Sequence, residues 1–98
     1  MKRLYVLISN DLDPIYGCVQ GGHAVAQWLL DHPNQNWNNN YLIYLSADIK
    51  KWQYLLSHKY KKEYTIFKEP DLNNQVTALA TQDDSGKIFR KLDLIHIN

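Results

Sequence analysis

Residues 3–30 read RLYVLISNDLDPIYGCVQGGHAVAQWLL and contain the first two structural elements of the chain. Residues 3–8 are apolar at nearly every position and rich in strand formers, which predicts a strand covered on both faces. Asp13 followed by Pro14 is a helix-start signal, because Asp can accept hydrogen bonds from free amides and Pro has no amide to leave unpaired. A helix is therefore expected over 14–30, and a strand followed by a helix indicates an α/β fold.

Two stripes of side chains run along this predicted helix. Apolar and small residues recur at three- and four-residue spacing and are expected to form the buried stripe, which consists of Ile15, Cys18, Val19, Gly22, Val25, Ala26, Leu29 and Leu30. A second stripe carries side chains with polar groups, namely Tyr16, Gln20, His23 and Gln27. A glycine weakens a helix by about 1 kcal/mol relative to alanine. We therefore expect something to approach the backbone closely at Gly17, Gly21 and Gly22.

The rest of the chain continues the alternation of strands and helices. Periodicity and turn signals predict three more strands, over 41–46, 64–67 and 75–81, and one more helix, over 49–60. The tail suggests a short helical turn near Phe89 and then an extended segment over 92–97. This order predicts an α/β domain built as a three-layer sandwich, with a mixed four-stranded sheet flanked by helices.

Length and composition narrow the possible classes of protein. A chain of 98 residues favours one domain spanning 1–98, and its 12% aromatic content argues against a disordered protein. No apolar run approaches the roughly 20 residues of a membrane span, and the N-terminal segment is too short for a secretory signal, so a cytoplasmic protein is expected. The single cysteine, Cys18, excludes an internal disulfide and is expected in the core. The histidines lack metal-ligand spacing, and no cofactor is expected.

The charge distribution is uneven although the formal net charge is only +1. Residues 50–68 contain six lysines and one glutamate. Such a block is typical of a solvated helix face, and it could also face a polyanion such as RNA.

A second informative segment follows the strand predicted over 64–67. Glu69 and Asp71 lie in the loop after that strand, and Thr77 lies in the next strand. Ligands in open α/β sheets favour the crevice beyond the carboxyl ends of parallel strands, which is where this loop is expected. The alternative is ordinary turn chemistry, in which Pro70 restricts φ and Asp71 accepts backbone hydrogen bonds.

Together these segments resemble the type II peptidyl-tRNA hydrolases over nearly the whole chain. The resemblance rests on the loop Ser9-Asn10-Asp11-Leu12, on Gln20-Gly21-Gly22-His23-Ala24 in the helix, and on the strand Thr77-Ala78-Leu79-Ala80. It implies a mixed four-stranded sheet flanked by helices. The implied reaction is hydrolysis of the ester between a peptide and the 3′ end of tRNA, without a metal cofactor.

The resemblance also implies roles for individual residues of this chain. Glu69 or Asp71, together with His23, become the candidates for the base and for orienting water. Gln20 and Thr77 become the candidates for hydrogen bonds to the ester or to the terminal ribose.

Substrate-binding candidates follow in the same way. The family places a lysine one helical turn before the glutamine, and this chain has Tyr16 there, which carries no permanent charge. Lys68, beside the acid, is the candidate that replaces the missing cation. Lys59, Lys61 and Lys62 are expected to contact tRNA phosphates.

Two other hypotheses remain open from the sequence. The same fold could be a catalytically inactive module that binds RNA or a protein, with Tyr16 offering a flat contact surface. The glycine-rich helix face could instead join two copies of the chain into a homodimer.

Overall fold

The computed structural model describes residues 2–95 of the chain. The elements of that part are β1 (Arg3–Ser9), α1 (Pro14–Asp31), β2 (Leu42–Ala47), α2 (Ile49–Tyr54), β3 (Thr65–Glu69), β4 (Gln75–Asp83) and β5 (Asp93–Leu94). A π-helical segment, Leu55–Lys59, continues α2, and short 3-10 turns follow β3 and β4, at Pro70–Leu72 and Lys87–Phe89.

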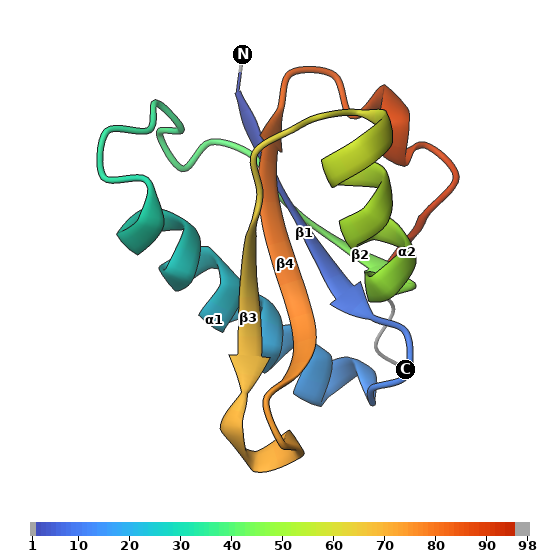
Figure 1. The fold of residues 1–98 in the computed structure, drawn as a ribbon. Coiled ribbons are helices and arrows are strands. Elements are labelled where there is room, and N and C mark those ends of the chain that lie inside the picture. Colours follow the sequence, from blue (N-terminus) through green and yellow to red (C-terminus); the bar gives the residue numbers. More distant parts are fainter. Residues whose placement is uncertain (1, 96–98) are drawn as a thin grey trace.

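The strands form one mixed sheet in the order β3-β4-β1-β2-β5 (Figure 1). β1 and β2 pair in parallel, whereas β4 is antiparallel to both β1 and β3. It follows that β1, β2 and β3 run in the same direction, so their carboxyl ends meet at one edge of the sheet. We call this edge the carboxyl edge.

The prediction of a four-stranded sheet is wrong by one strand, because β5 pairs with β2. So short a strand has no period that the sequence could show. β3 and β4 also end later than predicted, at Glu69 and Asp83. The predicted helical turn near Phe89 is confirmed by the 3-10 turn there. The end of the predicted extended segment, residues 96 and 97, lies outside the described residues.

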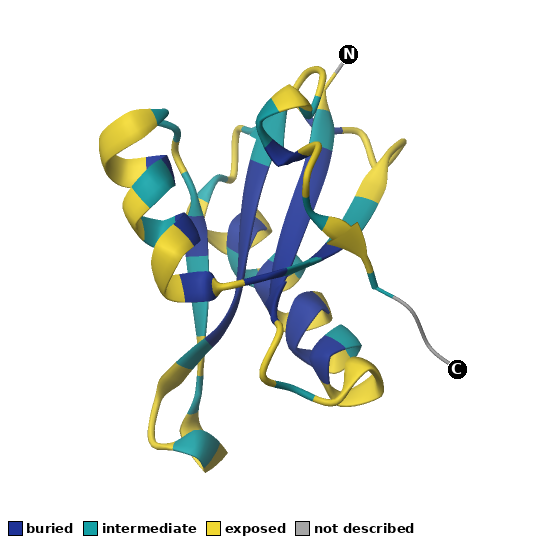
Figure 2. Cartoon of the chain, turned by 90° about the vertical axis from the view of Figure 1, so that its right-hand side faces the viewer, coloured by how far each residue is buried: buried dark blue, intermediate teal, exposed yellow. Residues whose placement is uncertain are grey.

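Helices cover both faces of the sheet, and two hydrophobic clusters lie between the layers. Leu4, Val6 and Ile8 pack in the cluster under α1. Tyr5 and Leu7 pack in the other cluster, under α2. Figure 2 shows the central strands in the colour of buried residues and the outer sides of the helices in that of exposed ones. The prediction that the first strand is covered on both faces is therefore confirmed.

The predicted buried stripe of α1 is wrong. The exposed residues include Ile15, Val19, Leu29 and Leu30, and Cys18 is only half-buried rather than in the core. The helix instead buries a row of mostly smaller residues and one tryptophan, namely Gly17, Gln20, Gly21, Ala24 and Trp28. Small residues let the helix axis approach the sheet, and the buried glutamine is hydrogen-bonded, as described below.

The expected close approach to the glycines is confirmed at two of the three positions. A Cβ added to Gly17 would lie 2.7 Å from Ile8 Cγ2, and one added to Gly21 would lie 2.8 Å from Tyr44 Cε2. Nothing lies within 4 Å of a Cβ at Gly22. Gly17 and Gly21 therefore face the sheet of their own chain and offer no surface to a second copy.

The predicted helix starts are confirmed by side-chain caps. Asp13 accepts hydrogen bonds from the backbone amides of Ile15 and Tyr16, and Pro14 opens α1. Asp48 caps α2 by accepting a hydrogen bond from the amide of Lys51. Among residues 2–95, no helix combines the length and apolar character needed to cross a membrane.

One ion pair ties the segment before β3 to the end of β4. Lys62 Nζ lies 2.8 Å from Asp83 Oδ1, and Asp83 Oδ2 accepts a hydrogen bond from the amide of Gly86 at 2.7 Å. Burial alone would raise the pKa of Asp83, but the bonds from Lys62 and the backbone amides outweigh it and lower the pKa. The carboxylate therefore stabilises the fold above its unfolded pKa of about 4, and that contribution is lost as pH falls through the lowered value.

We accordingly expect Asp83→Asn to lower the free energy of unfolding by about 1 kcal/mol at pH 7, and by much less at pH 3. Urea titrations at the two pH values measure the difference. Asp84→Asn is the control, because Asp84 pairs with Lys2 at the exposed surface and its loss should cost less. A loss of stability at Asp83 that is unchanged at pH 3 would contradict this account.

Candidate functional site

β3 lies beside α1 and contacts it along most of its length. Thr65 at the start of the strand donates a hydrogen bond to Asp31 at the end of the helix. Phe67, in the middle, stacks on His23, with ring centroids 4.5 Å apart and planes 10° from parallel. Glu69, at the carboxyl edge, meets the first turns of α1. The strand and helix thus run antiparallel, and the end of β3 meets the beginning of α1.

Four polar side chains form a connected hydrogen-bond network there. Glu69 Oε1 accepts hydrogen bonds from Tyr16 Oη at 3.2 Å and from Gln20 Nε2 at 3.1 Å. Gln20 Oε1 in turn accepts one from Thr77 Oγ1 at 2.7 Å. We call these four residues the Glu69 network. The network brings together two segments of the sequence that are about 50 residues apart. Each of these segments was singled out separately in the sequence.

Burial within the Glu69 network is graded. Thr77 and Gln20 are fully buried, with 0% and 1% of their surface exposed, whereas Glu69 is half-buried. The hydroxyl of Thr77 fixes the amide of Gln20, so that the Gln20 Nε2 donor faces Glu69. No hydrogen bond to Glu69 Oε2 comes from the described part of the chain. The network therefore holds a carboxylate at the surface in a fixed position and leaves one of its oxygens for a water or a ligand.

A β-bulge explains why Thr77 reaches this network. Phe67 pairs with Ala78 and Lys68 pairs with Val76, so Thr77 has no partner on β3. Val76 packs in the cluster under α2, and Ala78 packs in the cluster under α1. The extra residue lets Thr77 turn to the same face as Ala78, where its hydroxyl meets helix α1. Bulges often re-aim a side chain in this way beside functional sites.

The structure distinguishes the two candidate carboxylates. Glu69 accepts two hydrogen bonds from α1, whereas Asp71 lies exposed in the 3-10 turn, where no hydrogen bond to its side chain is seen among residues 2–95. Partial burial of Tyr16 and its contact with Glu69 raise the pKa of the Tyr16 phenol, with a smaller contribution from Asp71. Tyr16 therefore remains a protonated donor to Glu69 at neutral pH.

His23 and Lys68 border the network without joining it. His23 is exposed on α1, three residues after Gln20, and its ring lies flat on Phe67. Neither carboxylate is hydrogen-bonded to it within the described chain. Lys68 is exposed, and the alternation along β3 places it on the face opposite Glu69.

The structure does not bring the other predicted lysines to the Glu69 network. Lys59, Lys61 and Lys62 precede β3, whereas Glu69 ends it, so the whole strand separates the two groups. Lys62 is engaged by Asp83. The expected contact of Lys59, Lys61 and Lys62 with tRNA phosphates stays a prediction, and it concerns a surface apart from Glu69.

A basic groove of about 630 Å³ lies between helix α2 and the segment that follows β4. Trp52 and Tyr60 stack in its wall, with ring centroids 6.1 Å apart. Five cations line the groove and none of its lining residues is acidic; the cations are Lys51, Lys59, Lys87, Arg90 and Lys91. Sequence analysis missed the last three, which lie far along the chain from the lysine block. The close spacing of Lys87, Arg90 and Lys91 in the sequence is the signal that could have identified them.

The groove and the Glu69 network lie on different faces of the sheet. Trp52 belongs to the cluster under α2, whereas Phe67, beside the network, packs in the cluster under α1. Within the described residues, no three His, Cys, Asp or Glu side chains are grouped so that they could hold a metal ion.

Comparisons with known proteins identify a similar fold. No protein-family model matches the sequence, and no curated protein matches it. Among solved structures, a protein of unknown function from Agrobacterium tumefaciens strain C58, Atu0240, is similar with a TM-score of 0.62. The likeness covers 98% of each chain, with 12% sequence identity. At this identity the likeness shows the fold alone, a small compact α/β domain.

Proposed function

We propose that this protein hydrolyses the ester that joins a peptide, or a related acyl group, to the 3′-terminal ribose of tRNA. The resemblance of the sequence to type II peptidyl-tRNA hydrolases suggests the substrate. The Glu69 network is the observation that supports the reaction, because ester hydrolysis needs a positioned proton acceptor beside a water molecule.

In the proposed reaction, Glu69 Oε2 accepts a proton from a water molecule while the water oxygen attacks the ester carbonyl carbon. The bond from that carbon to the ribose oxygen then breaks. The ribose oxygen takes up a proton, which gives a free 3′-hydroxyl on the tRNA and a carboxylic acid on the peptide. Atoms balance with one water consumed per ester.

The neighbouring side chains have distinct roles in this proposal. Gln20, held by Thr77, and Tyr16 fix the carboxylate through its other oxygen, so that Oε2 keeps one position. His23 lies exposed beside the site and is the side chain we assign to protonating the leaving ribose oxygen. Tyr16 replaces the lysine of the family as a neutral donor.

The test is a cleavage assay with purified protein and peptidyl-tRNA, run in parallel with an established peptidyl-tRNA hydrolase. We expect free tRNA to accumulate over many turnovers with this protein as well. Substrate that stays intact here, while the established enzyme cleaves it, would overturn the proposed activity.

Thr77→Val isolates the positioning role of the buried hydroxyl. We expect turnover to fall about tenfold, since one lost hydrogen bond of about 1.4 kcal/mol corresponds to a factor of ten. Thr81→Val is a matched control, because Thr81 is equally buried on β4 and donates to the backbone oxygen of Glu63, away from the network. Both variants should lose similar stability in urea, and only Thr77→Val should lose activity. Equal turnover in the two variants would contradict the positioning role.

A catalytically inactive RNA-binding module is the second candidate, and the basic groove favours it. Cations that contact phosphates release counterions, so the affinity for RNA falls as salt rises. We expect tRNA binding to weaken steeply with KCl concentration, and the double variant Arg90→Gln/Lys91→Gln to lower the log–log slope by about 2. Lys50→Gln is the control, because Lys50 is exposed on α2 outside the groove lining. Binding of tRNA without cleavage would favour the inactive RNA-binding module over the hydrolase. A salt-dependence slope that the double variant leaves unchanged would show that the basic groove is not the RNA-binding surface.

A further inference from the structure

A second cavity lies at the opposite edge of the sheet from the Glu69 network. Its volume is about 490 Å³, within the range of small-molecule sites. Its walls come from the end of α1 with the loop after it, from the segment before β3, and from the end of β4. We call it the Trp28 cavity, after the buried tryptophan in its wall. It shares no lining residue with the Glu69 network or the basic groove.

Trp28, in the wall of this cavity, has a buried donor without a partner among the described residues. The residue is 3% exposed, and its indole Nε1 has no hydrogen-bond partner within residues 2–95. Leaving a buried donor unpaired costs about 1–3 kcal/mol, so such groups call for a specific explanation. The comparable indole of Trp37 donates to the backbone oxygen of Tyr41 at 2.9 Å. Trp28 therefore carries a buried N–H that the described chain leaves unsatisfied, in a wall of the cavity.

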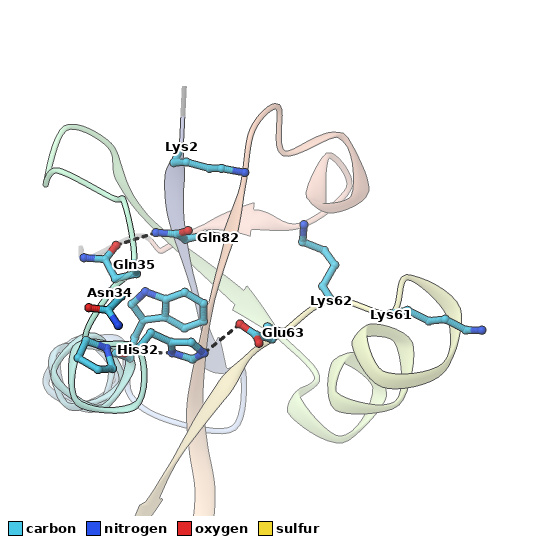
Figure 3. A pocket seen from close by; sticks show the side chains of 10 residues that line it. Lys2, His32, Asn34, Gln35, Lys61, Lys62, Glu63 and Gln82 are labelled. Atoms are coloured by element: carbon cyan, nitrogen blue, oxygen red, sulfur yellow. Dashed lines mark hydrogen bonds and ion pairs between the residues drawn. The ribbon is translucent and has the colours of Figure 1, made fainter.

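The walls of the cavity are tied together by polar contacts (Figure 3). His32 stacks on Trp28 with centroids 3.7 Å apart, and its Nε2 lies 3.2 Å from Glu63 Oε2 across the cavity. Gln82 Nε2 donates to Gln35 Oε1 at 2.8 Å. These contacts link three separate segments, so the cavity is formed before any ligand arrives.

Two lysine ammonium groups supply hydrogen-bond donors at the walls of the cavity. Figure 3 shows Lys2 and Lys62 extending over the upper part of the cavity, while Lys61 points away from it. Each ammonium group has three donors, and the aspartate partners of Lys2 and Lys62 leave others free. Glu63 is the acidic residue among the lining side chains, and it already faces His32. A ligand with acceptor atoms and an anionic end complements the free donors of these two ammonium groups.

We propose that the Trp28 cavity binds a small organic oxyanion. Its phosphate or carboxylate end contacts Lys2 and Lys62, and its body packs against the wall that contains Trp28. This site is separate from the ester-hydrolysing site, and the proposal does not depend on the proposed function.

The indole resonance of Trp28 in a proton–nitrogen NMR spectrum is a direct reporter. The chain has three tryptophans, so three such signals are expected, and Trp28→Phe identifies the one of interest. AMP, citrate and adenosine are titrated separately. We expect the Trp28 signal to move saturably with AMP or with citrate while those of Trp37 and Trp52 stay in place. A response to AMP alone identifies phosphate as the charged end of the ligand, and a response to citrate alone identifies carboxylate.

Adenosine tests the need for charge, and we expect it to bind at least tenfold more weakly than AMP if phosphate is the charged end. Lys2→Gln should weaken the binding of the active probe about tenfold by calorimetry, whereas Lys61→Gln, on the lysine that points away, should change it less than twofold. A Trp28 signal that responds to neither anion at millimolar concentration would overturn the proposal. Equal effects of the two lysine variants would overturn the assigned contacts.

Discussion

Glu69→Gln is expected to lower kcat/KM for peptidyl-tRNA at least about a hundredfold, with the fold retained. A positioned general base contributes about 10²–10⁴ in rate, and the amide of glutamine cannot accept the proton from water. Glutamine keeps the size of the side chain and a carbonyl oxygen that can still accept from Tyr16 and Gln20. Initial rates with purified variant measure the loss, and a circular dichroism spectrum with a urea titration shows that the protein is folded.

Asp71→Asn is the matched control for that variant. Asp71 lies two residues further along the chain, is exposed, and stays outside the Glu69 network. We expect its rate to change by no more than about threefold, because a neighbouring exposed charge acts on the site only through solvent-screened electrostatics. Similar losses in the two variants, or a larger loss for Asp71→Asn, would show that the base is assigned to the wrong carboxylate.

Gly17→Ala is expected to lower the free energy of unfolding by about 1–3 kcal/mol, the usual cost of overpacking a core. The added Cβ would lie 2.7 Å from Ile8 Cγ2, and that methyl group sits on a β-branched, buried side chain in the central strand β1. Neither the helix nor the strand can move away without disturbing the layer between them. Urea unfolding monitored by tryptophan fluorescence measures the change.

Gly22→Ala, on the same helix, is expected to change the free energy of unfolding in the opposite direction from Gly17→Ala. Nothing lies within 4 Å of its added Cβ, so the substitution gains helix propensity without a clash. We expect it to raise the free energy of unfolding by about 0.5–1 kcal/mol. If both alanines stabilise the protein, then α1 does not pack against the sheet as closely as described.

Local signals in the sequence were sufficient for much of the fold. The unbroken apolar run of β1 predicted burial on both faces, and Asp13 with Pro14 predicted the first turn of α1. The buried face of α1 was not predictable from hydrophobicity, because close packing against Ile8 requires small residues rather than large apolar ones. Leu30, which is 74% exposed, shows that an apolar residue on a helix need not face the core.

The candidate site was predictable in its residue types and not in its geometry. Glu69 and Asp71 both follow the same apolar strand, and only the end of β3 and its register with β4 decide which carboxylate meets α1. Thr77 reaches Gln20 through a bulge, and a bulge depends on strand pairing that local sequence does not show. For the same reason, the positive charges of the basic groove come from two segments that only the fold brings together.

Hydrolysis of peptidyl-tRNA in water enriched in oxygen-18 tests the proposed reaction most directly. With the wild-type protein, we predict that each released peptide carries one labelled oxygen in its new carboxyl group and that the tRNA carries none. With Glu69→Gln, we predict that release falls at least about a hundredfold. Peptide that stays on the tRNA, or labelled release that is equally fast in the variant, would contradict the assignment of Glu69 as the base of an ester hydrolase.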